Sequence, residues 1–202
     1  LAAGYDKDCK ILTSLDVFGF GYIVGGTITR FPLAGNPRPR MFRIKDSESL
    51  INSLGFPNMG LDSAFMRLEQ VRNVIGDTRL VVSVSGTMKD DILYCYRRLE
   101  PLVDVIELNI SSPNTKGIRV FQEPQKFEEL LVSLKAIKEK PLFLKLPPYF
   151  DEMQKSRVME LVDLCIKYSV DGVTTVNTWP VEDNRLALGK GGLSGKPLYP
   201  HM

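Results

Sequence analysis

A chain of 202 residues, 44% of them hydrophobic, is long enough to build one large domain around a real core, and no low-complexity or disordered tract is visible. The formal net charge of +2, with basic residues scattered along the chain, argues against nucleic acid as the main partner. No apolar run is long enough to cross a bilayer, and no signal peptide is recognisable.

The first residues, 1–4, look like the end of a core strand, so we expect sequence to be missing upstream. A short helix is predicted over residues 6–15. A strand is predicted over residues 20–26, and its closing glycines would let a flat ligand lie against the backbone. Residues 27–60 form a long excursion rich in Pro, Gly, Asn and Arg, and loops of this length are usually functional or disordered. We expect this excursion to lie over the active-site face, with Arg38, Arg40 and Arg43 as solvated surface charges.

From residue 62 onward, predicted helices and strands alternate. The strands are short, continuous and rich in Val, Leu and Ile, as expected when both faces are buried. This alternation implies βαβ units and a parallel sheet, arranged either as an open doubly wound sheet or as a (β/α)8 barrel. The predicted helices cover residues 62–75, 88–99, 124–138 and 151–168, and the predicted strands cover residues 79–85, 104–110, 141–146 and 170–177.

Polar residues at the carboxyl ends of the predicted strands favour the barrel. In a barrel these ends converge on one face, where the active site lies, whereas an open sheet binds its ligand at one switch point. No strand is followed by a GxGxxG or GxxxxGK[ST] phosphate loop. We therefore predict one partial (β/α)8 TIM barrel over residues 1–202, with about six of the eight βα units, and with a loop at residues 191–197 that leads into a further helix.

The titratable residues limit the chemistry. Cys9, Cys95 and Cys165 are far apart and have no metal-binding spacing, so a reduced, cytosolic compartment is the simpler interpretation. The only histidine, His201, stands one residue from the end, which argues against a Ser-His-Asp triad or a histidine-based metal site. Acid–base chemistry would then fall to Ser, Lys, Tyr, Asp or Glu, and no metal is predicted.

Two lysines and several amides are candidates for a binding site. Lys145 stands in the apolar strand PLFLKLPP, where an unpaired ammonium is unfavourable. It fits a Schiff base in an aldolase-type barrel, a partner for an anion or an electron-rich ring, or a snorkelling strand-end lysine. Lys7 is either a second cation near this face or a surface residue at a helix start. Amides with a donor and an acceptor suit a flat heterocycle, and they fall at loop starts and strand ends: Asn52, Asn109, Asn114 and Asn177.

Five motifs carry a resemblance to a known family. They are AAGYDK at residues 2–7, GNPRPR at 35–40, INSLGF at 51–56, NISSPNT at 109–115 and GGLSGKPL at 191–198. In order and spacing they resemble the dihydroorotate dehydrogenases, FMN-dependent (β/α)8 barrels of pyrimidine biosynthesis. The resemblance spans essentially the whole chain. It implies oxidation of dihydroorotate to orotate, with hydride transfer from C6 to flavin N5.

The resemblance also implies residue roles. Ser112 matches the base that removes the C5 proton; since a serine hydroxyl is a weak base, it needs a neighbour or a water, and Thr115 is the candidate relay. Lys7 matches the lysine that meets the orotate carboxylate. Lys145 matches the lysine near flavin N1 and O2, where a fixed cation stabilises developing charge. The other expected substrate contacts are Asn52, Leu54, Gly55, Phe56, Asn114, Asn177 and Thr178. The other expected FMN contacts are Ala2, Ala3, Gly4, Gly26, Thr27, Ser83, Asn109 and Gly195.

Features of two subclasses meet in this sequence. Ser83 and the segment KLPPYF at residues 145–150 resemble the soluble members, whereas Ser112 and GGLSGKPL resemble the quinone-using members. We expect a quinone as electron acceptor, with fumarate or another soluble acceptor as the alternative. We expect a cytoplasmic protein, with membrane association through an N-terminal segment absent from this sequence as the alternative, and a homodimer as one form of assembly.

Two alternative functions remain. One is another FMN-barrel pyrimidine reductase, similar to dihydropyrimidine dehydrogenase; Ser112 counts against it, because those enzymes usually carry Cys there. The other is a barrel fragment without activity that serves in assembly or binding. The family holds the FMN phosphate through glycine-rich loops after strands seven and eight, which this sequence does not contain. We therefore expect these 202 residues alone to bind FMN poorly or not at all.

Overall fold

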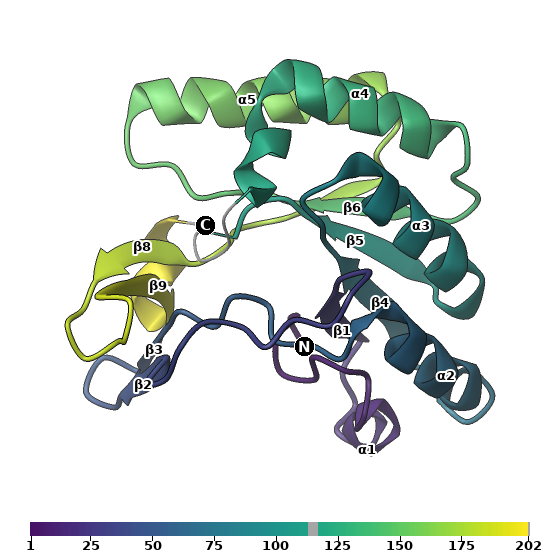
Figure 1. Ribbon diagram of the computed structural model, residues 1–202, viewed down its shortest axis with the longest axis horizontal. Coiled ribbons are helices and arrows are strands. Elements are labelled where there is room, and N and C mark those ends of the chain that lie inside the picture. The colour runs from purple at the N-terminus through teal and green to yellow at the C-terminus, as the bar shows by residue number, and fades with distance from the viewer. Residues whose placement is uncertain (113–116, 202) are drawn as a thin grey trace.

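Five parallel strands form the centre of the fold (Figure 1). The structure, a computed structural model, describes residues 1–112 and 117–201, with side chains up to residue 199. Each strand pairs in parallel with the next, and no pairing joins the two edges of this sheet within the described ranges. In order across the sheet the strands are β1 (Tyr22–Ile28), β4 (Arg79–Val84), β5 (Val105–Asn109), β6 (Leu142–Lys145) and β7 (Gly172–Thr174).

Helices cover the outer side of this sheet, and the core lies between the two layers (Figure 1). On α4, apolar residues recur at helical spacing, with Phe127, Leu130 and Leu134 fully buried. Burial of a side chain of this kind contributes about 1.5–3 kcal/mol. The helices are α1 (Leu12–Asp16), α2 (Gly60–Arg72), α3 (Lys89–Leu99), α4 (Pro124–Lys135) and α5 (Glu152–Lys167), and the short 3₁₀ turns are η1 (Glu100–Leu102), η2 (Ile118–Gln122) and η3 (Lys196–His201).

The first six residues run beside β1 without forming a regular strand. The Leu1 amino group donates to the carbonyl of Tyr22, and the amide of Val24 donates back to Leu1, at 2.8 and 2.9 Å. Further along, the Gly4 amide donates to the Gly26 carbonyl at 2.8 Å. The segment predicted as the first strand therefore hydrogen-bonds along the edge of β1, although it does not form a regular strand.

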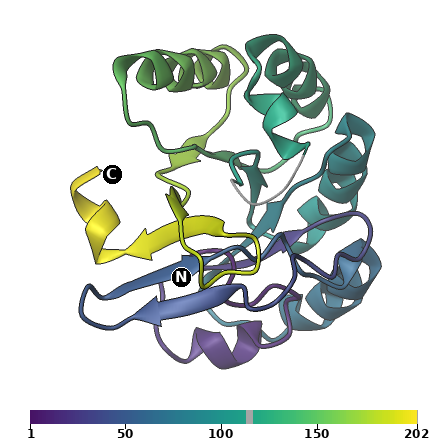
Figure 2. The ribbon, with the colours of Figure 1, turned by 60° about the vertical axis from the view of Figure 1, so that its left-hand side comes forward.

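A second, antiparallel sheet corrects the prediction that residues 27–60 are irregular. It contains β2 (Met41–Ile44), β3 (Ser49–Asn52), β9 (Lys190–Gly195) and β8 (Trp179–Glu182), in that order. The blue β2–β3 hairpin pairs with the yellow β9 in Figure 2, although 140 residues separate Asn52 from its partner Gly192. The prediction of a loop at residues 191–197 was also wrong, because most of this segment belongs to β9 and the rest begins η3.

Two predicted elements are shorter in the structure. The helix expected over residues 6–15 is only α1, because the Asp6 carboxylate accepts hydrogen bonds from the amides of Lys10 and Ile11 at 2.9 and 2.8 Å and holds that stretch as a loop. The strand expected over residues 170–177 is only β7, and the chain continues from it into β8. The predicted class, a β/α fold with a parallel sheet, is confirmed.

Candidate functional site

Polar side chains line the inner face of the parallel sheet, away from the helices. On β5, Ile106 and Leu108 pack into the helix-covered core, so the alternate residues Glu107 and Asn109 point to the opposite face. Residues that pair across neighbouring strands line up in two adjacent rows on this face. One row contains Ser83, Glu107 and Phe143, and the other contains Asn109, Lys145 and Thr174.

A buried hydroxyl–amide network joins three of the predicted cofactor contacts. Thr27 Oγ1 and Ser83 Oγ lie 3.0 Å apart, and Asn109 Nδ2 donates to Thr27 Oγ1 at 3.2 Å. Ser85 Oγ donates to the Asn109 carbonyl at 2.5 Å. These residues are almost fully buried, so the bonds fix their side chains in place. The structure therefore brings together Thr27, Ser83 and Asn109, which are far apart in the sequence.

A second cluster connects β5 with the segment after β7. Asn177 Nδ2 donates to Ser111 Oγ at 2.9 Å and lies 3.4 Å from Asn109 Oδ1. Asn109 Oδ1 also accepts from the amide of Ser111 at 3.3 Å. Ser112, the predicted base, follows directly in the chain and is 5% exposed. Sequence reasoning assigned no role to Ser111, although it stands in the predicted loop.

Lys7 lies beside the N-terminal segment, among charges of both signs. Its ammonium donates to the Gly4 carbonyl. Burial and the nearby Arg40 guanidinium lower the pKa of Lys7, whereas Asp8 and Asp6 act in the opposite direction. The interpretation of Arg40 as a solvated surface charge was wrong, because Arg40 is half-buried and donates to the carbonyls of Ala34 and Asn36 at 2.8 and 3.0 Å.

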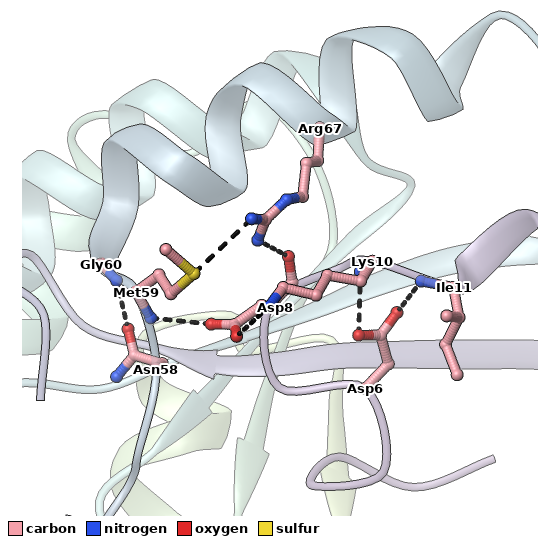
Figure 3. A network of polar contacts seen from close by, with 8 residues as sticks. All are labelled: Asp6, Asp8, Lys10, Ile11, Asn58, Met59, Gly60 and Arg67. Carbon is pink, nitrogen blue, oxygen red and sulfur yellow. Dashed lines mark hydrogen bonds and ion pairs between the residues drawn. The ribbon is translucent and has the colours of Figure 1, made fainter. Parts of the chain in front are cut away.

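A polar network fixes the loop that carries Lys7 (Figure 3). The Asp8 carboxylate accepts a hydrogen bond from the amide of Met59 at 2.7 Å, and Arg67 donates to the Asp8 carbonyl at 2.8 Å. Met59 stands at the start of α2 and Arg67 lies within it. Asp6 and Asp8, the two neighbours of Lys7, are therefore both held, and the Lys7 loop is tied to the beginning of α2.

The predicted pyrimidine contacts at residues 52–56 approach Thr178 through β9. Asn52 Nδ2 lies 3.5 Å from the Gly192 carbonyl, and a Cβ atom at Gly192 would collide with the Thr178 side chain. The absence of a side chain at Gly192, the strand partner of Asn52, therefore leaves room for the Thr178 side chain. Phe56 has a φ of 53°, and its carbonyl accepts from Asn58 Nδ2 at 2.8 Å.

Other predicted residues are less closely grouped. Gly195 stands at the far end of β9 from Gly192 and pairs with Ser49. Ala2 is exposed and Ala3 is half-buried, so both offer small side chains at the open side of the N-terminal segment. Leu54 and Gly55 continue the segment after Asn52, with the Leu54 amide 3.4 Å from Asn52 Oδ1. Asn114 and Thr115 lie outside the described residues.

A cavity borders the second cluster. Ser111 and Thr178 line this cavity of ≈ 470 Å³, together with Pro147, Pro148 and Phe150. A second cavity, of ≈ 810 Å³, is lined by loops after β1 and β4 and by residues at Asn36 and Gly55. In the part of the chain that the structure describes, no group of three His, Cys, Asp or Glu residues could hold a metal ion. The groups described at this face are amides, hydroxyls, the Glu107 carboxylate, the Lys145 ammonium, and Lys7 with the nearby Arg40.

Comparison with known proteins gives one consistent result. The chain matches the family model described as "Dihydroorotate dehydrogenase" over residues 1–201. It is 38% identical to a "Dihydroorotate dehydrogenase (quinone)" of Alkalilimnicola ehrlichii, with 99% of this chain and 63% of that protein covered. A protein of the same description from Thermus thermophilus is also 38% identical, with 98% and 59% covered. The chain thus spans about three fifths of the length of these curated relatives, 63% and 59%.

Solved structures agree. The ligand-free DHODH of Eimeria tenella superimposes with a TM-score of 0.87 and 29% identity, covering 100% of this chain and 65% of that one. Its complex with ferulenol gives a TM-score of 0.86 at 29% identity, covering 98% and 61%.

Proposed function

Since the chain belongs to the dihydroorotate dehydrogenase family, we propose that the protein oxidises dihydroorotate to orotate, with FMN as hydride acceptor and a quinone as final electron acceptor. The observation that carries this proposal is the cluster of Asn109, Ser111 and Asn177, which lies at the carboxyl end of the sheet directly beside the buried Ser112. Amides that are already oriented by each other suit a flat ring with alternating carbonyl and N–H groups.

The inner face fits a flavin. Thr27, Ser83 and Asn109 present fixed hydroxyls and an amide, and Gly4 has no side chain to fill the space near Lys7. When bound, FMN supplies the acceptor for the hydride. Lys145 places its ammonium on the same face, with no hydrogen bond or ion pair to another described residue, and a fixed positive charge there favours the electron-rich form of the ring.

Two cations on the N-terminal side fit the substrate carboxylate. Lys7 lies close enough to Arg40 for the guanidinium to lower its pKa, and an anion between them relieves this repulsion. Asn52, Asn177 and Thr178 then face the pyrimidine ring with donors and acceptors. Lys7 and Arg40 thus fix one end of the substrate, and the amides fix its ring.

Ser112 takes the role of base. As the C5=C6 double bond forms, the C5 proton passes to Ser112 Oγ and the C6 hydrogen leaves as hydride. A neutral hydroxyl is a weak base, so the proton must move on through a neighbour or a water. Ser112 is almost fully buried, which keeps bulk water away from the reacting atoms. Thr115 is the proposed relay.

Quinone is the favoured acceptor because the relatives from two bacteria carry that word in their descriptions, and Ser112 agrees with that subclass. Among the described residues, no helix combines the length and the apolar character needed to cross a membrane.

The experiment is anaerobic mixing of the FMN-loaded protein with dihydroorotate, followed through the visible flavin absorbance. We expect bleaching, and its absence would remove the proposal. Ser112→Ala should slow the bleaching by about 10²–10⁴-fold and leave orotate binding nearly unchanged. Ser133→Ala, which removes an exposed hydroxyl on α4, is the matched control. Bleaching at the control rate in Ser112→Ala would place the base elsewhere.

A further inference from the structure

Glu107 is a buried carboxylate on the inner face of the parallel sheet, and the mechanism above does not use it. Its side chain is directed away from the helix-covered core, and the residue is 3% exposed. Carboxylates are almost never buried in this way unless they are paired. A specific partner is therefore expected.

One of the two oxygens of the Glu107 carboxylate has a hydrogen-bond partner. Glu107 Oε2 accepts a hydrogen bond from Thr174 Oγ1 at 2.8 Å. Glu107 is on β5 and Thr174 is on β7, with β6 between them. Since neighbouring strands lie about 4.8 Å apart, the side chain must cross over β6 to make this bond. It crosses between the two inward residues of β6, Phe143 and Lys145.

The position of Phe143 directs the carboxylate toward Lys145. Phe143 pairs with Glu107 on one side and with Gly172 on the other, and its ring covers Gly172, where a Cβ atom would lie 2.8 Å from the ring. Lys145 pairs with Thr174, the residue to which Glu107 is bonded. The carboxylate therefore lies on the Lys145 side of the Phe143 ring.

The other oxygen, Glu107 Oε1, is buried and has no hydrogen-bond partner in the structure. Leaving a buried acceptor unpaired costs about 1–3 kcal/mol, and more when the group is charged. Val81, Ser83 and Phe143, the other inward residues at this level on β4 and β6, carry no charge. Lys145, two residues further along β6 than Phe143, is the inward cation nearest to Glu107 in register, and its ammonium forms no hydrogen bond or ion pair with another residue in 1–112 or 117–201.

We propose that Glu107 is a positioning residue whose unpaired oxygen receives the Lys145 ammonium, holds it on the inner face and thereby moderates the positive charge presented to FMN. The inference rests on the proposed function. The Lys145 charge favours the reduced flavin ring. Glu107 partly offsets that charge and so weakens the preference. Removal of the Glu107 charge leaves the lysine uncompensated, so the two-electron midpoint potential of bound FMN rises.

The test compares the FMN-loaded wild type with Glu107→Gln, Lys145→Gln and the double variant, in anaerobic titrations against a reference dye. Glu107→Gln keeps the shape of the side chain and an acceptor for Thr174. We expect it to tighten binding of reduced over oxidised FMN about tenfold, which is about 30 mV for a two-electron couple. Lys145→Gln should lower the potential. In protein that already carries Lys145→Gln, adding Glu107→Gln should shift the midpoint potential by less than about half as much as it does in the wild type.

Two results would overturn the proposal. One is an unchanged potential in Glu107→Gln; the other is an equal shift in both backgrounds, which would make Glu107 a direct charge that does not act through Lys145. Glu129→Gln, on the exposed side of α4, is the matched control. If Glu107→Gln does not fold, Glu107→Asp withdraws the carboxylate from Lys145 and should raise the potential to a smaller degree.

A measurement without FMN separates this proposal from the proposed function. In urea unfolding of the FMN-free chain, Lys145→Gln should be destabilising, and adding Glu107→Gln should recover part of the loss. Wild-type protein that is not reduced by dihydroorotate would refute the proposed function and leave this stability coupling intact. Strictly additive unfolding free energies would refute the pairing, whatever the enzyme does.

Discussion

Replacement of Asp8 tests whether the position of Lys7 depends on the network around it. The Asp8 carboxylate accepts from the Met59 amide at 2.7 Å, and its side chain is only 18% exposed. Hydrogen bonds to charged groups contribute about 1.5–3 kcal/mol, and a carboxylate at a helix start adds about 0.3–1 kcal/mol. Because the site is partly open to solvent, we expect the lower end: Asp8→Ala should reduce the free energy of unfolding by about 2 kcal/mol, and Asp8→Asn by about 1 kcal/mol.

The same replacements change the pH dependence of orotate binding. Burial and Arg40 lower the pKa of Lys7 below 10.5, and Asp8 opposes that shift, so loss of the Asp8 charge lowers the pKa further. If Lys7 meets the orotate carboxylate as proposed, binding needs the protonated ammonium, so affinity should fall as pH rises through the folded pKa of Lys7, and should fall earlier in both variants. The unfolded chain holds this proton more tightly, so stability should rise with pH between the folded pKa and 10.5.

The assay is urea unfolding, together with orotate titration of the FMN-loaded protein followed by flavin absorbance. Asp8→Asn retains an acceptor for Met59, whereas Asp8→Ala does not, so the comparison isolates the hydrogen bond from the charge. We expect Asp8→Ala to bind orotate about threefold more weakly than Asp8→Asn, an effect of under 1 kcal/mol. Asp163→Asn, an exposed change on α5, is the control. Equal orotate affinity in the two Asp8 variants would refute the role of the network.

Three further predictions concern the scaffold. Glu100 Oε1 accepts from Tyr96 Oη and from the amides of Glu139 and Lys140, each at 2.8 Å, so Glu100→Ala should lower the free energy of unfolding by about 3 kcal/mol; a loss under about 1 kcal/mol in urea would contradict this. Burial raises the pKa of Cys95 and of Cys165 to about 12, so a thiol reagent near neutral pH should leave the native chain unmodified and react only after unfolding. Gly26 has a φ of 104° and a Cβ there would lie 2.6 Å from the Ser83 carbonyl, so Gly26→Ala should destabilise by more than about 2 kcal/mol, whereas Gly21→Ala, with open space around it, should be nearly neutral.

The elements that the sequence predicted well are those with a local pattern. On α3, Ile92, Cys95 and Leu99 recur at helical spacing and are buried, and the continuous Val and Leu run of β4 is buried on both faces. In such segments the residues that define the element are also those that form the core. Their type and approximate bounds therefore follow from the sequence without knowledge of the partner strands.

The second sheet was missed because its stability is not local. β3 is only Ser49–Asn52, flanked by a hairpin partner of four residues, and neither strand shows a convincing alternation of apolar residues. β3 is held by pairing with β9, which is rich in glycine and therefore looks like a loop in the sequence. Residues Gly191 and Gly192 are small because Asn52 and Thr178 pack against them.

The candidate site also contains residues that could be predicted from the sequence and residues that could not. Thr27, Ser83, Asn109 and Asn177 stand at or near the carboxyl ends of predicted strands, which the topology of a parallel sheet brings together, and the family resemblance implied their roles. Arg40 and Glu107 were not predicted, and each for a physical reason. Arg40 lies in an irregular segment, so its approach to Lys7 depends on how that segment folds back.

Glu107 was overlooked for a different reason, since a lone carboxylate in an apolar strand carries no motif. Only the strand order shows that it must cross β6 to reach Thr174, and only the burial of Oε1 shows that this bond leaves the carboxylate incomplete. The sequence predicts Lys145 as a charge that acts on a bound ring and gives no sign of a partner for it. The structure places a buried carboxylate on the neighbouring strand, one inward register position away. If the two groups pair as proposed, the protein can adjust the strength of the Lys145 charge through this one residue.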